Sequence, residues 1–170
     1  MLISNTKAIL SALLLATATI LSGPVKAQTA ASEVVVRTSP ESNFDFDIKS
    51  TKGKAVLVFH WSTSCNICLD KMNELRNNMA GWRGKAFVIV AINHDRSRQN
   101  FQDYLRIHKW VNGESNQFVH VFHKDLAQDS LYKNERLPTS YLLDSQQALK
   151  RTYVGRIPVE AWDDIADLLP

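Results

Sequence analysis

The sequence AVLVFHWSTSCNIC, residues 55–68, joins an apolar segment to a closely spaced pair of cysteines. Residues 55–61 are nearly all apolar and rich in residues that favour strands, which is typical of a strand buried on both faces. Cys65 and Cys68 are the only two cysteines in the 170-residue chain. A disulfide closed over two intervening residues removes little chain entropy, so it stabilises a fold poorly. The spacing therefore indicates reversible redox chemistry rather than a structural staple.

A helix is predicted to begin at the cysteine pair and to end near Gly81 and Gly84. Apolar residues recur along one face with helical spacing, namely Cys68, Met72, Leu75, Met79 and Trp82. A helix N-terminus offers free N–H groups and the positive end of the helix dipole, and both favour a thiolate. We therefore predict that Cys65 is the attacking thiol and that Cys68, which begins the apolar face, is the less exposed resolving thiol.

The rest of the chain alternates strand and helix patterns. Further strands are predicted at 86–92, 117–122, 140–143 and 148–154, and further helices at 97–110 and 159–169. Strands joined by helices should be parallel, whereas the last two strands should form an antiparallel hairpin. Upstream, 34–37 is predicted as a short edge strand, and the apolar–acidic alternation of 44–48 predicts a half-exposed strand. The fold class is therefore α/β with a mixed sheet.

Residues 1–27 are predicted to be a signal peptide. Lys7 precedes an apolar run at 8–21, and small residues follow where a signal peptidase cleaves, after Ala27 or, as a second site, after Ala30. An uncleaved membrane anchor is the alternative, although the run is shorter than the ~20 apolar residues that a span requires. Residues 28–43 then form a flexible lead-in, and 44–170 form the domain. Without residues 1–27 the net charge falls from +3 to +1, so nothing indicates a nucleic-acid partner.

A structural zinc site is disfavoured because it needs four ligands. Apart from the two cysteines, the candidates are five histidines. His120 and His123 are the only close pair, and residues three apart on a strand point to opposite faces. We expect no metal, and no cofactor beyond the redox-active disulfide.

His60 has two interpretations. Facing Cys65 as an imidazolium, it would lower the pKa of that thiol. The predicted strand places it on the face of Val56 and Val58, however, which favours a buried neutral histidine with a hydrogen-bond partner. His94 and Asp95 end a strand at the edge where α/β proteins bind ligands, and a loop cap is the favoured role.

Three segments together resemble the thioredoxin superfamily, and more narrowly its exported TlpA-like members. They are VLVFHWSTSCNIC, the strand AFVIVAIN followed by His94 and Asp95, and LPTSYLLD at residues 137–144. The resemblance covers about 44–170. It implies a thioredoxin-like fold of three layers, with a mixed central sheet flanked by helices and an N-terminal strand or hairpin extension.

The resemblance also implies a site around the cysteines. Pro138 should be cis and lie beside them, with Leu137 and Thr139 lining a substrate groove. The predicted groove residues on the cysteine side are Trp61, Ser64, Asn66 and Ile67, with Trp61 packed under the active-site turn.

Several positions depart from the family pattern. Phe59 replaces the buried Asp of thioredoxin six residues before the first cysteine. Lys71 replaces a Glu common in TlpA-like proteins three residues after the second. Ser64 replaces the usual Trp, and the dipeptide Asn66-Ile67 has neither Pro nor Gly. No carboxylate is therefore identified as proton acceptor for Cys68.

Cys65 and Pro138 are 73 residues apart, which exceeds the spacing in plain thioredoxin but leaves no room for the helical insertion of strong periplasmic oxidases. We therefore predict a periplasmic oxidoreductase that exchanges disulfides with exported proteins, in the reducing direction. Its electrons would come from a membrane thiol-disulfide donor, because the chain has no Gly-rich nucleotide-binding loop.

Two alternatives on the same fold remain open. One is a thiol peroxidase, which requires a peroxidatic loop that 62–65 only faintly matches. The other is a copper-binding chaperone that uses two cysteines and a distant histidine, although such proteins usually space the cysteines four apart.

Overall fold

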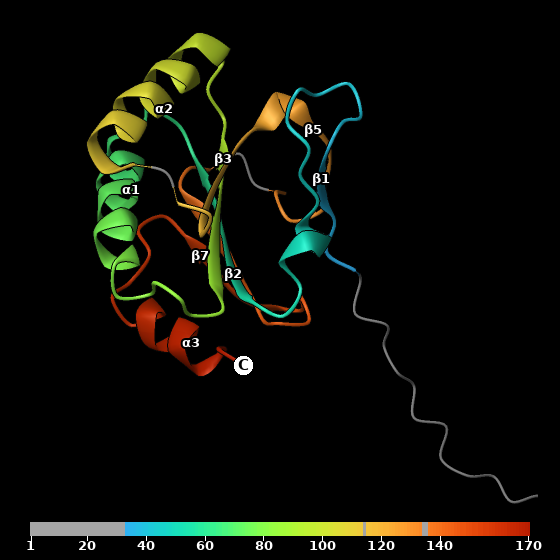
Figure 1. The fold of residues 1–170 in the computed structure, drawn as a ribbon, viewed down its shortest axis with the longest axis vertical. Coiled ribbons are helices and arrows are strands. Elements are labelled where there is room, and N and C mark those ends of the chain that lie inside the picture. The colour runs from blue at the N-terminus through green and yellow to red at the C-terminus, as the bar shows by residue number, and fades with distance from the viewer. Residues whose placement is uncertain (1–32, 114, 134–135) are drawn as a thin grey trace, which may run out of the picture. The chain divides into compact units, whose positions relative to one another are not determined.

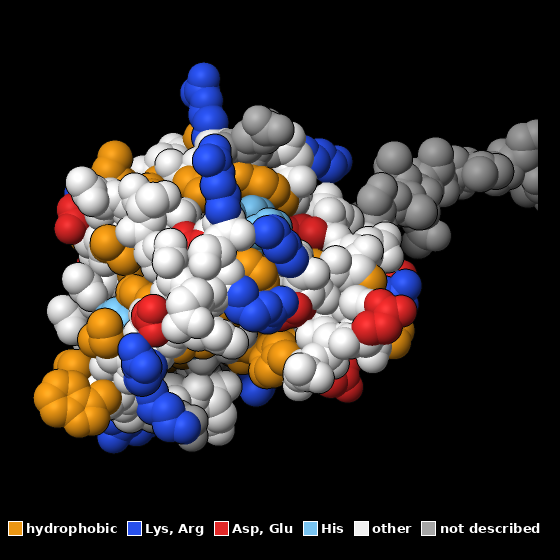
Figure 2. Space-filling model, turned by 90° about the horizontal axis from the view of Figure 1, so that it is seen from above, with side chains coloured by type: hydrophobic (Ala, Val, Ile, Leu, Met, Phe, Trp, Pro, Cys, Tyr) orange, Lys and Arg blue, Asp and Glu red, His pale blue; other side chains and the backbone are white. Residues whose placement is uncertain are grey.

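The computed structural model describes residues 33–113, 115–133 and 136–170. The predicted signal peptide and residues 28–32 of the predicted lead-in lie outside these ranges. Within them, no helix is both long enough and apolar enough to cross a membrane. Figure 2 shows one face of the molecule, on which basic, acidic and apolar side chains are interspersed.

A five-stranded mixed sheet forms the centre of the described chain, with the order β4-β3-β2-β6-β7. Strands β2 (Ala55–Trp61), β3 (Phe87–Asn93) and β4 (Phe118–Phe122) are parallel, and β6 (Thr139–Leu143) and β7 (Leu149–Val154) complete it as an antiparallel hairpin. Every residue of β2 and β3 is buried, as the apolar runs predict. The parallel and antiparallel arrangement predicted from the connections is confirmed.

The α-helices α1 (Asn66–Met79), α2 (Arg98–Asn112) and α3 (Ala161–Asp167) cover one face of this sheet (Figure 1). The crossovers β2–α1–β3 and β3–α2–β4 step in the same direction, and right-handed crossovers of that kind place both helices on one face. The core on this face includes Leu57, Phe59, Trp61, Cys68, Met72, Leu75, Phe101 and Ile165. The apolar face predicted for the helix after the cysteines is therefore the face that packs.

Among the described residues, no α-helix covers the opposite face. Strands β1 (Val36–Thr38) and β5 (Leu126–Asp129) form a two-stranded antiparallel sheet there (Figure 1). Two 3-10 helices accompany them: η1 (Ile48–Thr51) lies between β1 and β2 in the chain, and η2 (His123–Asp125) directly precedes β5. The second core contains Val36, Phe46, Ile48, Val56, Val58, Val90, Val121 and Leu131. The predicted three-layer fold is thus confirmed, and one of its outer layers consists of a small sheet and short 3-10 turns.

The strand predicted at 44–48 is wrong. Only a single bridge, between Arg37 and Asp47, forms there. Asp47 instead caps η1, because its Oδ1 accepts a hydrogen bond from the backbone N–H of Lys49 at 2.8 Å. Phe46 and Ile48 still alternate into the second core, so the pattern reports packing without a strand ladder.

Candidate active site

Cys65 and Cys68 form a disulfide at the start of α1, with their Cα atoms 5.1 Å apart. Cys65 is the N-cap residue, and its Sγ accepts a hydrogen bond from the backbone N–H of Cys68 at 3.1 Å. Cys65 is half-buried, whereas Cys68 is fully buried in the core under the helices. No acidic side chain occupies the first turn of α1 to offset the positive end of its dipole. The two sulfurs therefore differ in access, and the accessible one lies where a thiolate is best stabilised.

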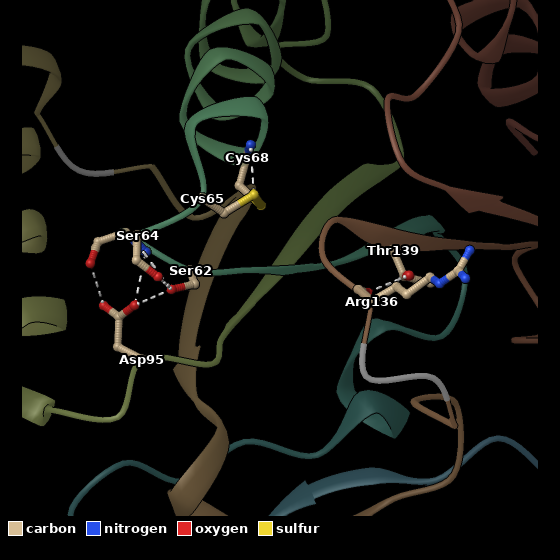
Figure 3. Close-up of a disulfide and its surroundings, with 8 residues drawn as sticks. Ser62, Ser64, Cys65, Cys68, Asp95, Arg136 and Thr139 are labelled. Carbon is tan, nitrogen blue, oxygen red and sulfur yellow. Dashed lines mark hydrogen bonds between the residues drawn. A yellow bond between two sulfur atoms is a disulfide. The ribbon is translucent and has the colours of Figure 1, made fainter.

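The loop between β2 and α1 is hydrogen-bonded to Asp95, which lies two residues after the end of β3 (Figure 3). Asp95 Oδ1 accepts hydrogen bonds from Ser62 Oγ at 2.6 Å and from the backbone N–H of Thr63 at 2.8 Å. Its Oδ2 accepts one from Thr63 Oγ1 at 2.9 Å. Ser62 Oγ also lies 2.9 Å from Ser64 Oγ. The cysteine loop is thus fixed by one buried carboxylate.

The role expected for residues 94–95 was a loop cap. Asp95 instead holds the neighbouring cysteine loop by hydrogen bonds, a contact that was not predicted from the sequence. A detectable signal exists: three hydroxyl residues follow β2, and an acid stands two residues after the end of β3. Parallel neighbouring strands end at the same edge of a sheet, so the hydroxyls and the acid could have been paired.

The peptide bond between Leu137 and Pro138 is cis, as the resemblance implies. Strand β6 pairs with β2 so that Thr139 lies opposite His60. This register brings Pro138 to the end of β2 from which the cysteine loop departs. Figure 3 shows Thr139 and Arg136 on the side of the disulfide away from Asp95.

The residues predicted to line a substrate groove divide by exposure. Ser64, Asn66 and Ile67 are exposed around Cys65, and 48% of the Ile67 surface is accessible. Leu137 is half-buried against the core. The other two predictions need correction.

Trp61 and Thr139 have no accessible surface, so neither lines an open groove. Trp61 ends β2 on the face covered by helices and packs on the Tyr104 ring at 4.4 Å between centroids. Thr139 uses its hydroxyl within the loop, where Oγ1 donates to the backbone carbonyl of Arg136 at 2.8 Å. Both residues support the site from inside the protein.

His60 is a buried histidine on the face opposite the cysteines, as its alternation with Val56 and Val58 predicts. Nδ1 of His60 lies 2.9 Å from Nε2 of His94. The His60 ring also stacks on the Tyr132 ring, with 4.5 Å between the ring centroids. Burial, and then the neighbouring His94, lower the pKa of His60 well below 6.5. The neutral buried interpretation is confirmed, and the alternative in which an imidazolium faces Cys65 is wrong.

His94 and His123 extend this group of rings, with their ring centroids 5.0 Å apart. His123 Nδ1 lies 3.0 Å from the backbone carbonyl of Asn93. A pocket of about 200 Å³ opens beside them; it is lined by His94, His123, Leu126, Ala127, Gln128, Asp129 and Tyr132. Within the described parts of the chain, no three His, Cys, Asp or Glu side chains are arranged to hold a metal ion.

Lys71 occupies the position of the missing family carboxylate, and it is 2% exposed. It shares the buried face of α1 with Cys68, one turn earlier. Its Nζ donates to Glu74 Oε2 at 2.6 Å. This position therefore holds a buried lysine paired with Glu74 rather than a carboxylate.

Comparison with known proteins supports this fold. The AhpC/TSA family matches residues 31–158. The thiol-disulfide oxidoreductase ResA of Bacillus subtilis is 21% identical over 123 residues, which are 72% of this chain and 65% of ResA. The match thus spans slightly less than two thirds of that relative.

Two solved structures share the architecture. A DsbF homologue from Corynebacterium diphtheriae has a TM-score of 0.61 at 20% identity, covering 79% of this chain and 84% of its own. The exposed lipoprotein thioredoxin Etrx1 of Streptococcus pneumoniae has a TM-score of 0.55 at 16% identity, covering 81% and 100%. At these identities the likeness establishes the thioredoxin fold.

Proposed function

We propose that this chain, which belongs to the AhpC/TSA family, is an exported TlpA-like thiol-disulfide oxidoreductase that exchanges disulfides with partner proteins through Cys65 and Cys68. The observation that carries the proposal is the unequal placement of the two sulfurs. Cys65 is accessible at the N-cap of α1 and receives an N–H hydrogen bond, whereas Cys68 is fully buried one turn along the helix. A partner protein can reach only the first.

In the reducing direction the reduced pair begins with Cys65 as a thiolate. Its sulfur attacks a partner disulfide, a Cys65–partner bond forms, and the other partner sulfur leaves as a thiolate. The Cys68 thiolate then attacks Cys65, which re-forms the Cys65–Cys68 disulfide and releases the second partner thiolate. Two electrons pass from the pair to the partner, and the partner's thiolates take up the two protons that the pair gave up.

The exposed Ser64, Asn66 and Ile67 and the half-buried Leu137 would contact the partner chain around this exchange. Pro138, in its cis peptide, would shape the opposite wall. A polar residue at Ser64 and a branched apolar one at Ile67 would accept an extended segment with mixed side chains. No further cofactor is needed, because the reduced cysteine pair itself carries the two electrons.

The reducing direction is supported by what lies between the cysteines and Pro138. The described residues of that interval form α1, β3, α2, β4, η2 and β5, with no added helical domain. Oxidised protein would be re-reduced by a membrane thiol-disulfide donor. The sequence of residues 1–27 supports export to the periplasm with cleavage after Ala27, an uncleaved anchor being the alternative.

A trapping experiment tests the proposal. Reduced Cys68→Ser protein mixed with insulin should accumulate a disulfide-linked adduct on a non-reducing gel, because the resolving thiol is missing. Cys65→Ser is the matched control and should form none, since its remaining thiol is buried. Equal adducts from both variants, or none from either, would contradict the assigned roles.

Hydrogen peroxide and copper(I) serve as further arms of the same experiment. Rapid peroxide consumption without an insulin adduct would favour the thiol peroxidase alternative. Tight copper binding without an adduct would favour the chaperone.

A further inference from the structure

Asp95 is a buried carboxylate that the exchange reaction itself does not use. It is 4% exposed and follows the end of β3 by two residues. Its own backbone N–H donates to Asn93 Oδ1 at 3.0 Å, and Asn93 is fully buried. The carboxylate therefore stands on a rigid strand end rather than on a free loop.

All three groups that Asp95 binds are donors on the cysteine loop. They are Ser62 Oγ at 2.6 Å, Thr63 N–H at 2.8 Å and Thr63 Oγ1 at 2.9 Å. An ionised carboxylate has enough lone pairs on two oxygens to accept all three, and such charge-assisted bonds are strong. An amide in its place could accept only through its single oxygen.

Ser62 connects this tie to Cys65. The backbone carbonyl of Ser62 accepts a hydrogen bond from the Cys65 N–H at 3.2 Å. Ser62 Oγ also accepts one from the Ser64 N–H at 3.2 Å. The residue that Asp95 holds is thus the residue that starts the turn into the helix.

We propose that Asp95 is a positioning residue that orients Cys65 for disulfide exchange by locking the β2–α1 turn. With the turn locked, Cys65 stays at the N-cap and its Sγ keeps the 3.1 Å hydrogen bond from the Cys68 N–H. The inference rests on the proposed function for its significance, but it concerns the geometry of Cys65 and can be tested on that thiol alone.

The carboxylate has a second effect of opposite sign. Its negative charge near the loop disfavours a thiolate, so removing it would by itself make Cys65 more reactive. The positioning effect predicts the reverse, because a loosened turn removes N–H stabilisation of the thiolate. The sign of the change on substitution therefore separates the two.

The test measures alkylation of Cys65 by iodoacetamide against pH in a Cys68→Ser background, where Cys65 is the single thiol. Asp95→Ala should raise the pH midpoint and slow the reaction at pH 7 by about three- to tenfold, the scale of one net intramolecular hydrogen bond. Asp95→Asn should recover part of the rate, because its oxygen can still accept the Thr63 N–H.

Asp144→Ala is the matched control. Asp144 is also a buried loop carboxylate, 8% exposed, and it accepts the N–H groups of Gln146 and Ala148 at 2.9 Å each. It follows β6, whose last residue pairs with Val56 near the start of β2, away from the cysteine loop. Its loss should lower stability without moving the alkylation midpoint.

An unchanged or lowered midpoint in Asp95→Ala would overturn the proposal. If that variant does not fold, Ser62→Ala removes one of the three donors and should move the midpoint upward by a smaller amount; no movement would likewise overturn it. Alkylation needs no partner protein. If the Cys68→Ser protein forms no insulin adduct, the proposed function is refuted, but the alkylation measurement still tests the role of Asp95.

Discussion

Acidification should destabilise this protein through His120, a half-buried histidine whose ordinary pKa is lowered by its surroundings. His120 lies on β4 with its ring stacked on Phe118, 4.9 Å between centroids. The Arg76 guanidinium lies 5.6 Å from the centre of the same Phe118 ring. Burial, and then the charge of Arg76, lower the pKa of His120 to about 3. Protonating His120 would place a second cation beside Arg76 in a poorly hydrated site.

The sign follows from proton counting. Between the two pKa values the unfolded chain binds a proton that the folded chain does not, so the free energy of unfolding falls as pH falls below about 6.5. With a folded pKa of about 3, the loss from His120 at pH 5 is about 2 kcal/mol.

His94 acts in the same direction, since burial and then His123 lower its pKa to about 4. Asp129 acts in the opposite direction, because burial raises its pKa. Since His94 shares a hydrogen bond with His60, their contributions are not independent. The quantitative prediction therefore uses His120 alone.

The assay is urea unfolding at pH 7.5 and pH 5.0 for the parent and His120→Phe. Phenylalanine keeps a ring to stack on Phe118, carries no proton, and removes a buried Nδ1 that has no hydrogen-bond partner. The variant should lose about 2 kcal/mol less than the parent between the two pH values. Equal losses in both proteins would refute the reasoning.

Two further predictions concern buried polar side chains and use urea midpoints. The free energy of unfolding of Lys71→Met should stay within about 1 kcal/mol of the parent value, because a buried ion pair adds little stability over an apolar side chain of similar volume. A loss as large as that expected for Lys71→Ala, about 2 kcal/mol or more, would contradict this. Gln147→Ala should cost about 1–3 kcal/mol, since Gln147 Nε2 donates to the Ile48 carbonyl and, at 3.1 Å, to Thr51 Oγ1. Gln147→Gly should recover part of that loss because φ is 67°; a glycine variant less stable than the alanine one would contradict the backbone argument.

The elements with strong local signals could be predicted from the sequence. Continuous apolar runs marked β2 and β3, and the helical spacing from Cys68 marked the buried face of α1. These features depend on neighbouring residues in the chain, which is the information that a single sequence carries. The cis bond before Pro138 was instead expected from the resemblance to the thioredoxin superfamily.

The missed features depend on contacts between distant segments. Strand β5 reads Leu-Ala-Gln-Asp and has no strand pattern; it forms by pairing with β1, about 90 residues earlier. Residues 44–48 have the alternation of a strand but form only a single bridge to β1, at Arg37, and no continuous ladder. Trp61 and Thr139 were assigned to the groove from their place beside the motifs. Trp61 is instead buried against Tyr104 under the helices, and Thr139 is buried inside the sheet opposite His60.

The reduction potential of the cysteine pair tests the central claim most directly. Purified protein would be equilibrated across dithiothreitol and glutathione buffers, and its free thiols counted by alkylation. We expect a two-electron transition with a midpoint near the roughly −270 mV of thioredoxin. A midpoint near the roughly −120 mV of a strong oxidase would contradict the reducing direction, and a disulfide that stays in one state across the whole series would contradict thiol-disulfide exchange itself.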